Sequence, residues 1–292
     1  MLRIFIVLFF CLSLTFAASA RIKVITTLFP EYDFVRSVGG DKVDVKLLLP
    51  PGIEPHAFEP TPQDILDINR ADIFIYTNRY MEPWVETLLK GTTGKNLLVV
   101  DASRGIQFMR GSGGVDPHVW LDLGNAQIMV DNVRDALIAK DPGDGPLYSS
   151  NADNYKQRLR QMDRQFKAAL ADCKHKLYIF GGHFAFSYFN RRYGLEYLSP
   201  YRGFSPDAEP TAKALIELIG KMRANDIKYV YYEELISPKV AQTIARETGA
   251  KLLLLHGAHN LSRSELGSGI TFLSIMERDL NNLKVGLECR QK

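Results

Sequence analysis

The sequence has little cysteine, no strong excess of either charge and, after its first twenty residues, no long apolar run. Without such a run, no later segment is expected to form a membrane-spanning helix. A formal net charge of +3 is close to neutral for a chain of this size and gives no support for a nucleic-acid-binding protein. Low-complexity tracts and short repeats are also absent. The length of 292 residues predicts one large or two medium globular domains.

The first twenty residues have the pattern of a secretory signal peptide. Arg3 supplies a basic start, residues 4–17 (IFIVLFFCLSLTFA) form an apolar core, and residues 18–20 (ASA) form a small-residue cleavage site. The apolar core is short for a membrane anchor. We therefore expect cleavage after Ala20 and export of a soluble protein to the periplasm, with Cys11 removed in the leader.

Export would leave two cysteines, Cys173 and Cys289. An oxidising compartment allows them to form a disulfide. Their distance in the sequence neither supports nor forbids that pair. Two unpaired, partly buried thiols are the alternative, and the sequence leaves both open.

Short β-rich runs alternate with helical patterns in both halves of the chain. The expected strands are residues 22–28, 43–49, 72–77, 96–100, 176–182, 227–233 and 250–255. The expected helices are residues 30–39, 61–71, 81–91, 122–140, 211–226, 237–249 and 269–288. Alternation of this kind is typical of βαβ units and a mainly parallel sheet flanked by helices.

A long amphipathic pattern at residues 147–173 separates the two alternating halves. Its apolar stripe, at steps of three and four, predicts one helix of about 27 residues, or roughly 40 Å. The stripe consists of Tyr155, Leu159, Met162, Phe166 and Leu170. We therefore predict an α/β protein with an N-terminal domain at residues 21–146 and a C-terminal domain at residues 174–292, joined by this helix.

Four of the six histidines fall in loops where two such domains could face each other. His56, His183 and His256 each follow an expected strand, and His118 precedes the expected helix at 122–140. Ligands of open α/β sheets bind beyond the carboxyl ends of the strands. Imidazole is the commonest nitrogen ligand, and nitrogen-rich tetrahedral sites favour zinc. The spacing therefore indicates a metal site.

Four acidic residues, Glu54, Glu59, Asp116 and Asp122, lie near these histidines in the sequence. A ligating imidazole usually donates its other N–H to a carboxylate or carbonyl, and Glu59 and Asp122 are candidates for that role. Both could instead be helix-entry acids, which the helix dipole favours. His259 lies three residues after His256 in a polar turn, and either it or water is the alternative to His256 as fourth ligand.

Five sequence blocks point to a known family. The blocks are, in order, LLPPGIEPHAFEPTPQDILDINRADIFIY, DPHVWLD, GGHFAFSYFNRRYGLEYL, SPDAEPTAKALIELI and YYEELISPKVAQTIARETGAKLLLL. They resemble the motifs of the zinc/manganese-type solute-binding proteins of ABC importers, the ZnuA/TroA-like family. The resemblance covers about residues 22 to 287. It implies two α/β domains joined by one long helix, with the metal held in the cleft between them.

The resemblance also implies ligands and a partner. It places His56, His118 and His183 at metal-ligand positions. A histidine at the third position resembles the zinc type, whereas a glutamate there marks the manganese type, so Zn2+ is favoured over Mn2+. Manganese also prefers harder oxygen donors. The family implies a monomer that delivers its ion to the membrane permease of an importer.

The chain departs from the family pattern in two places. Many members have an aspartate just after the last strand, where this chain has His256, so we predict a four-histidine site completed by that residue. Many zinc-binding members also carry a histidine-rich run before the DPH motif. Here the corresponding loop is RGIQFMRGSGGV, which contains no histidine.

Other functions remain as alternatives. A manganese- or iron-binding member of the same family would need a different metal preference. A secreted zinc hydrolase would need an open coordination position and a general base, and the HAFE segment is not the helical HExxH pattern. A surface adhesin is neither supported nor opposed by these residues. We expect a metal-binding protein without enzymatic activity.

Overall fold

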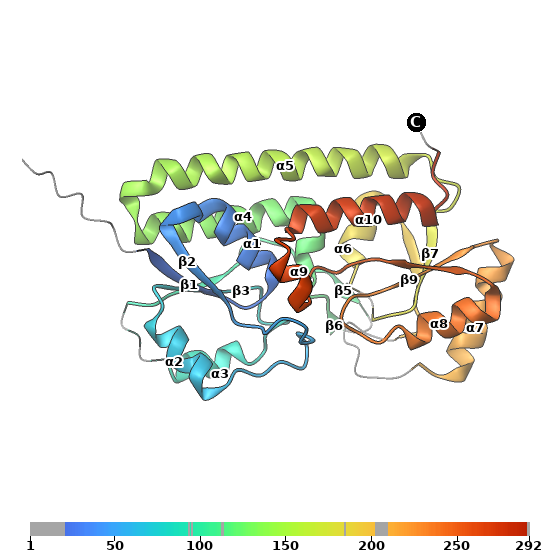
Figure 1. Cartoon of the computed structure of the whole chain (residues 1–292), viewed down its shortest axis with the longest axis horizontal. Helices are drawn as coiled ribbons and strands as arrows, with labels where there is room; N and C mark the ends of the chain where they lie inside the picture. The colour runs from blue at the N-terminus through green and yellow to red at the C-terminus, as the bar shows by residue number, and fades with distance from the viewer. Residues whose placement is uncertain are drawn as a thin grey trace, which may run out of the picture.

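The computed structural model describes residues 21–92, 94, 96–111, 114–183, 185–201 and 210–290, so the expected signal peptide lies outside the described residues. Two four-stranded parallel sheets form the frame, one from each half of the chain (Figure 1). This arrangement, with a long helix spanning both halves, confirms the α/β architecture that the sequence predicted. Among the described residues, no helix combines the length and apolar character needed to cross a bilayer.

The N-terminal sheet has the strand order β2-β1-β3-β4, so the chain changes direction across the sheet after β2. Its strands are β1 (Ile22–Thr26), β2 (Val43–Leu47), β3 (Ile73–Tyr76) and β4 (Leu98–Asp101). The connecting helices are α1 (Phe29–Gly39), α2 (Pro62–Arg70) and α3 (Val85–Lys90), with a 3-10 turn at Gly40–Lys42. Helix α2 begins with a capping box in which Thr61 accepts from the Asp64 amide, as expected for Thr-Pro.

The C-terminal sheet has the strand order β10-β9-β7-β8. Its strands are β7 (Leu177–Phe180), β8 (Glu196–Leu198), β9 (Tyr229–Tyr232) and β10 (Lys251–Leu254). The associated helices are α6 (Ser187–Tyr193), α7 (Ala212–Ala224), α8 (Lys239–Thr248), α9 (Arg263–Gly267) and α10 (Phe272–Gly286). In both sheets the carboxyl ends of parallel strands therefore meet at one edge.

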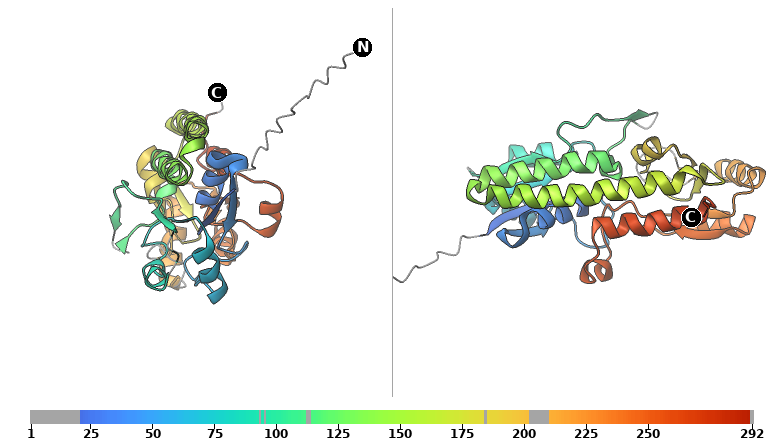
Figure 2. Two further views of the ribbon diagram at one scale, coloured as in Figure 1. Left: turned by 90° about the vertical axis from the view of Figure 1, so that its left-hand side faces the viewer. Right: turned by 90° about the horizontal axis from the view of Figure 1, so that it is seen from above.

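A layer of helices covers both sheets from one side (Figure 1). Helix α4 (Leu123–Lys140) is followed by a 3-10 turn at Pro142–Asp144 and by α5 (Gly145–Ala171), which packs on α4 and α1 in one half and on α10 in the other. Figure 2 shows α5 running along both halves. All five residues of the predicted apolar stripe of α5 are buried. Burial of this stripe holds the two sheets on a common helical layer.

Several short elements were not expected from the sequence. They are β8, α6, α9, a 3-10 turn at Val119–Leu121, and a small hairpin of β5 (Arg110–Gly111) and β6 (Gly114–Val115). A disulfide joins Cys173, just after α5, to Cys289, just after α10. It ties the far ends of two helices in the common layer.

Candidate metal centre

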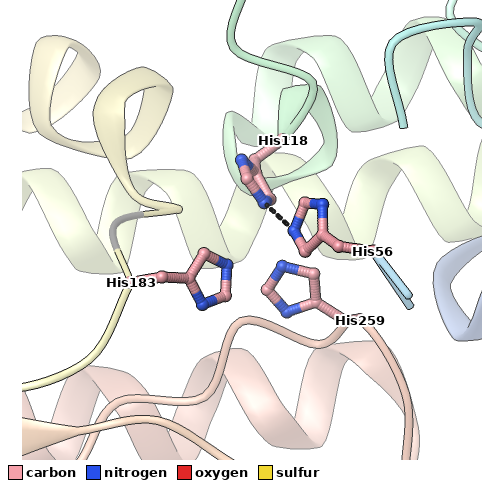
Figure 3. Close-up of side chains that lie close together, drawn as sticks. All are labelled: His56, His118, His183 and His259. Carbon is pink, nitrogen blue, oxygen red and sulfur yellow. Dashed lines mark hydrogen bonds between the residues drawn. The ribbon is translucent and has the colours of Figure 1, made fainter. Parts of the chain in front are cut away.

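Four imidazoles meet between the two sheets. His56 lies after β2, His118 before the 3-10 turn at Val119–Leu121, His183 after β7 and His259 after β10. One ring nitrogen of each lies within 4.8 Å of the others, and Figure 3 shows the four rings facing a common centre. The six distances between ring centroids run from 5.0 to 6.0 Å. The even spacing is compatible with tetrahedral coordination.

The fourth imidazole differs from the predicted one. His256 is fully buried but lies outside the cluster, and its Nδ1 accepts a hydrogen bond from the Ala258 amide at 2.9 Å. Its own amide donates to Asp279 Oδ1 at 3.0 Å. Ala258 has a left-handed φ of 55°, so the chain turns sharply there and brings His259 toward the other three rings. The structure therefore brings His259, and not the predicted His256, together with His56, His118 and His183.

Two of the imidazoles are held by a carboxylate on the nitrogen facing away from the cluster. His118 Nδ1 lies 2.8 Å from Asp116 Oδ1, which also accepts from the His118 amide at 3.0 Å. His259 Nδ1 lies 2.9 Å from Glu234 Oε1. A carboxylate on one ring nitrogen fixes the tautomer and orientation of the ring, and leaves the other nitrogen as a ligand.

His183 is held in the same way by Glu233 at the end of β9. The two side chains form an ion pair through Nδ1 and Oε2, and the His183 amide donates to Glu233 Oε1 at 2.8 Å. Gly182 is required for this approach, because a Cβ there would lie 2.2 Å from Glu233 Oε1. Among the described residues, no carboxylate makes a hydrogen bond to the ring of His56. This imidazole therefore lacks the orienting partner that the other three have.

The two acids predicted from the sequence do not contact the cluster. Asp122 caps helix α4 by accepting from the Gly124 and Asn125 amides, and it pairs with Arg192 at 2.8 Å. Glu59 is exposed, and the structure shows no hydrogen bond between it and His56. The orienting acids are instead Asp116, Glu233 and Glu234. The consecutive glutamates directly after β9 were the available sequence signal, because that position is the carboxyl end of a central strand.

The surroundings keep two imidazoles neutral. Burial, with the nearby His183 and His259, lowers the pKa of His56 to about 2. Burial also holds the pKa of His118 well below its usual range. For His183 burial is the largest single cause and acts in the same direction, but the charge and hydrogen bond of Glu233, with the charges of Glu234 and Glu54, together raise the pKa. Neutral imidazole is the form that binds a metal.

Buried nitrogen atoms without partners face the centre of the cluster. The Nε2 atoms of His183 and His259 are buried and hydrogen-bond to no group in the described part of the chain. Trp120 closes one side, with its ring centroid 5.4 Å from His118 and 5.3 Å from His259, and its Nε1 donates to the Gly257 carbonyl at 2.8 Å. Four converging nitrogen donors in an enclosed setting suit a borderline metal ion such as Zn2+.

Comparisons with known proteins point to zinc-uptake and zinc-binding relatives. The family model for ZnuA, the periplasmic zinc-uptake complex component A, matches residues 24–286. The high-affinity zinc uptake system protein ZnuA of Bacillus subtilis is 36% identical over 282 residues, which cover 91% of this chain and 88% of that protein. The zinc-binding protein AdcA of Streptococcus pyogenes is 34% identical over 292 residues, but this chain spans only 56% of its length.

A solved structure shares the fold over its whole length. The Zn(II)-bound ZnuA-like domain of Streptococcus pneumoniae AdcA superposes with a TM-score of 0.82 at 34% identity. The match covers 92% of this chain and 100% of that domain. The shared fold therefore includes both sheets and the long helix.

Proposed function

The chain belongs to the ZnuA family of periplasmic zinc-uptake components, and from that premise we propose that it binds one Zn2+ ion and delivers it to a membrane ABC importer. The zinc-uptake function of its relatives supports this role. We propose His56, His118, His183 and His259 as the four ligands. The observation that carries the proposal is the convergence of these four imidazole nitrogens within 4.8 Å.

The chemistry of the donors supports zinc over manganese. All four proposed ligands are nitrogen atoms, whereas Mn2+ prefers carboxylate, carbonyl and water oxygen. The three neighbouring carboxylates bond to imidazoles and so are engaged as orienting groups. A manganese- or iron-binding member of the family remains the second candidate for the metal, and competition between the ions separates the two.

We also propose that the protein binds zinc without catalysing a reaction. Four protein ligands would close the coordination sphere, as in non-catalytic zinc sites, and leave no position for an attacking water. Release then requires the docked permease to move a ligand loop. We also propose export through cleavage after Ala20, action as a monomer, and domains at residues 21–146 and 174–292 joined by the helix at 147–173.

The test of the ligand set is a zinc titration with chelator competition, repeated against Mn2+. The wild-type protein should bind one Zn2+ and retain it in excess Mn2+. His259→Ala should weaken zinc binding at least 100-fold, because a ligand is lost. His256→Ala should weaken it far less, because only the turn before His259 is loosened. Equal losses from the two variants would contradict the proposed set, and metal-dependent hydrolysis by the wild type would contradict the absence of catalysis.

A further inference from the structure

One buried amide joins the loops that carry two of the proposed ligands. Asn260 lies directly after His259 and is fully buried. Its Nδ2 donates to the Pro50 carbonyl at 2.8 Å and to the Ile53 carbonyl at 3.0 Å. Both carbonyls belong to the loop between β2 and α2, which carries His56. The amide therefore connects a loop of the C-terminal sheet to a loop of the N-terminal sheet.

The internal hydrogen bonds of the loop at residues 50–57 do not hold it against the C-terminal half. Residues 50, 52 and 53 are exposed, the Ile53 amide donates to the Pro50 carbonyl at 3.2 Å, and the Ala57 amide donates to Glu54 Oε2 at 3.0 Å. His56 is also the proposed ligand whose ring has no carboxylate partner in the described structure. The placement of this imidazole therefore depends on its contact with His118 Nε2 at 3.3 Å and on its backbone, which the buried Asn260 side chain ties to the loop of His259.

Only an amide fits this position. Both of its targets are carbonyl oxygens, so the side chain must supply two N–H donors from a single atom. Its Oδ1 accepts from the Leu261 amide at 2.8 Å, which orients the group. An aspartate of the same shape would keep this accepted bond but would place a carboxylate against two carbonyls. The geometry thus distinguishes asparagine from its closest isostere.

We propose that Asn260 is a positioning residue for metal binding, holding the loop of His56 against the loop of His259 so that the two imidazoles are placed before the ion arrives. The inference rests on the proposed function, since it concerns the same site. A backbone bond supports the same junction, because the Gly52 amide donates to the Leu261 carbonyl at 2.8 Å, and the Phe29 amide at the start of α1 separately holds the His259 carbonyl at 3.2 Å. Because these bonds persist without the side chain, we expect a partial loss rather than an abolished site.

The chain contains a matched control for this contact. Asn132 in α4 is also buried, and its Nδ2 donates to the carbonyls of Ala102 and Arg104 at 2.8 and 2.9 Å. It joins two parts of the N-terminal half and touches no ligand loop. Asn132→Asp therefore removes the same pair of bonds with the same change of side chain, away from the metal site.

The experiment measures zinc affinity and the zinc dissociation rate by chelator competition, with the melting temperature of the zinc-free protein recorded in parallel. Asn260→Asp should weaken zinc binding about 10- to 100-fold, the range found for groups that orient ligands. Asn132→Asp should lower the melting temperature comparably and change zinc affinity less than about threefold. Asn260→Ala provides the same test without a buried charge, should the aspartate variant fail to fold.

A double-mutant cycle separates positioning from general destabilisation. If Asn260 acts through His56, Asn260→Ala should have little further effect on zinc affinity in a His56→Ala background. An Asn260→Ala variant that binds zinc like the wild type, an equal loss for the two asparagine variants, or additive losses in the cycle would each overturn the inference. Failure of the proposed function would look different, because the wild-type protein itself would then not bind zinc.

Discussion

At the scale of single residues, the site combines two imidazoles whose pKa is lowered with one, His183, whose pKa is raised. Burial keeps the pKa of His56 and His118 far below their usual value, so both remain ready to bind a metal in mild acid. The carboxylate of Glu233 instead raises the pKa of His183 above 6.5. Below that raised pKa, the metal-free protein carries a proton on His183, and zinc must displace it.

The raised pKa of His183 predicts how zinc binding depends on pH. As the pH falls through the pKa of His183, zinc affinity should decrease, by up to about tenfold per pH unit. Glu233→Gln removes the charge that raises this pKa, so the decrease should begin at a lower pH, although affinity at pH 8 should also fall through the loss of orientation. Chelator competition at several values between pH 5.5 and 8 measures both effects.

Asp122→Asn serves as the control for that series, because Asp122 pairs with Arg192 and touches no histidine. Zinc affinity of the Asp122→Asn variant should depend on pH as it does in the wild type. A Glu233→Gln profile that declines over the same pH range as the wild type would show that His183 is not the group that zinc deprotonates.

Three of the four imidazoles in the cluster were predicted from the sequence because each lies near the end of an element. His183 lies just after β7 and His56 lies in the loop that follows β2, and parallel strands bring the loops at their carboxyl ends to one edge. The fourth depends on how the chain turns after β10, and that turn is set by tertiary contacts. The Asp279 carboxylate holds the His256 amide, and Ala258 adopts a left-handed conformation. Neither feature has a local sequence signature.

At the scale of elements, helix α1 carries a buried glutamate, Glu31, whose ionised form is disfavoured by its surroundings. Glu31 in the first turn is fully buried, and neither carboxylate oxygen finds a hydrogen-bond partner in the described structure. Burial, with the nearby charge of Glu82, raises its pKa from 4.5 to about 8. The folded protein therefore keeps Glu31 protonated at neutral pH, whereas the unfolded chain ionises it.

Replacement of this acid should change stability with a defined pH dependence. Glu31 should contribute a fall of about 1.4 kcal/mol per pH unit to the free energy of unfolding of the wild type as the pH rises between these two pKa values, because only the folded state holds this proton. Glu31→Gln cannot ionise, so the variant should gain stability over the wild type as the pH rises toward 8. Below about pH 4.5 the two proteins should differ little.

Urea unfolding of both proteins at pH 5 and pH 8 measures this difference. The gap between variant and wild type should be wider at pH 8. A gap of the same size at both values would mean that Glu31 does not take up a proton on folding.

The longer elements were predictable because their periodicity is sustained. The apolar stripe of α5 repeats over about four turns, and the expected range of 147–173 differs from the observed Gly145–Ala171 by two residues at each end. Strand β8, with three residues, and helix α9, with five, are too short to establish a period. Pairing with β7 forms β8, and the Ser262 capping box starts α9.

At the scale of the whole molecule, the disulfide ties the helical layer together. Cys173 and Cys289 are separated by 116 residues, so their bond constrains most of the C-terminal half in the unfolded state. Replacing both cysteines with serine should lower the free energy of unfolding by about 2–4 kcal/mol. Zinc affinity should be unchanged, because the bond lies after α5 and α10 rather than at the carboxyl ends of the strands.

Denaturant unfolding of the double-serine variant measures its stability, and chelator competition measures its zinc affinity. Equal stability would mean that the bond contributes nothing to folding, and weakened zinc binding would mean that the helical layer controls the site. The sequence identified the two cysteines but could not pair them. Their proximity arises only when α5 and α10 pack in the common layer.

The most direct test of the central claim is a crystal structure of the zinc-loaded protein with anomalous diffraction at the zinc edge. We predict one zinc peak with four nitrogen ligands at about 2.0–2.1 Å, from His56, His118, His183 and His259. A zinc ion bound by His256, or one with water in place of any of these four imidazoles, would contradict the account.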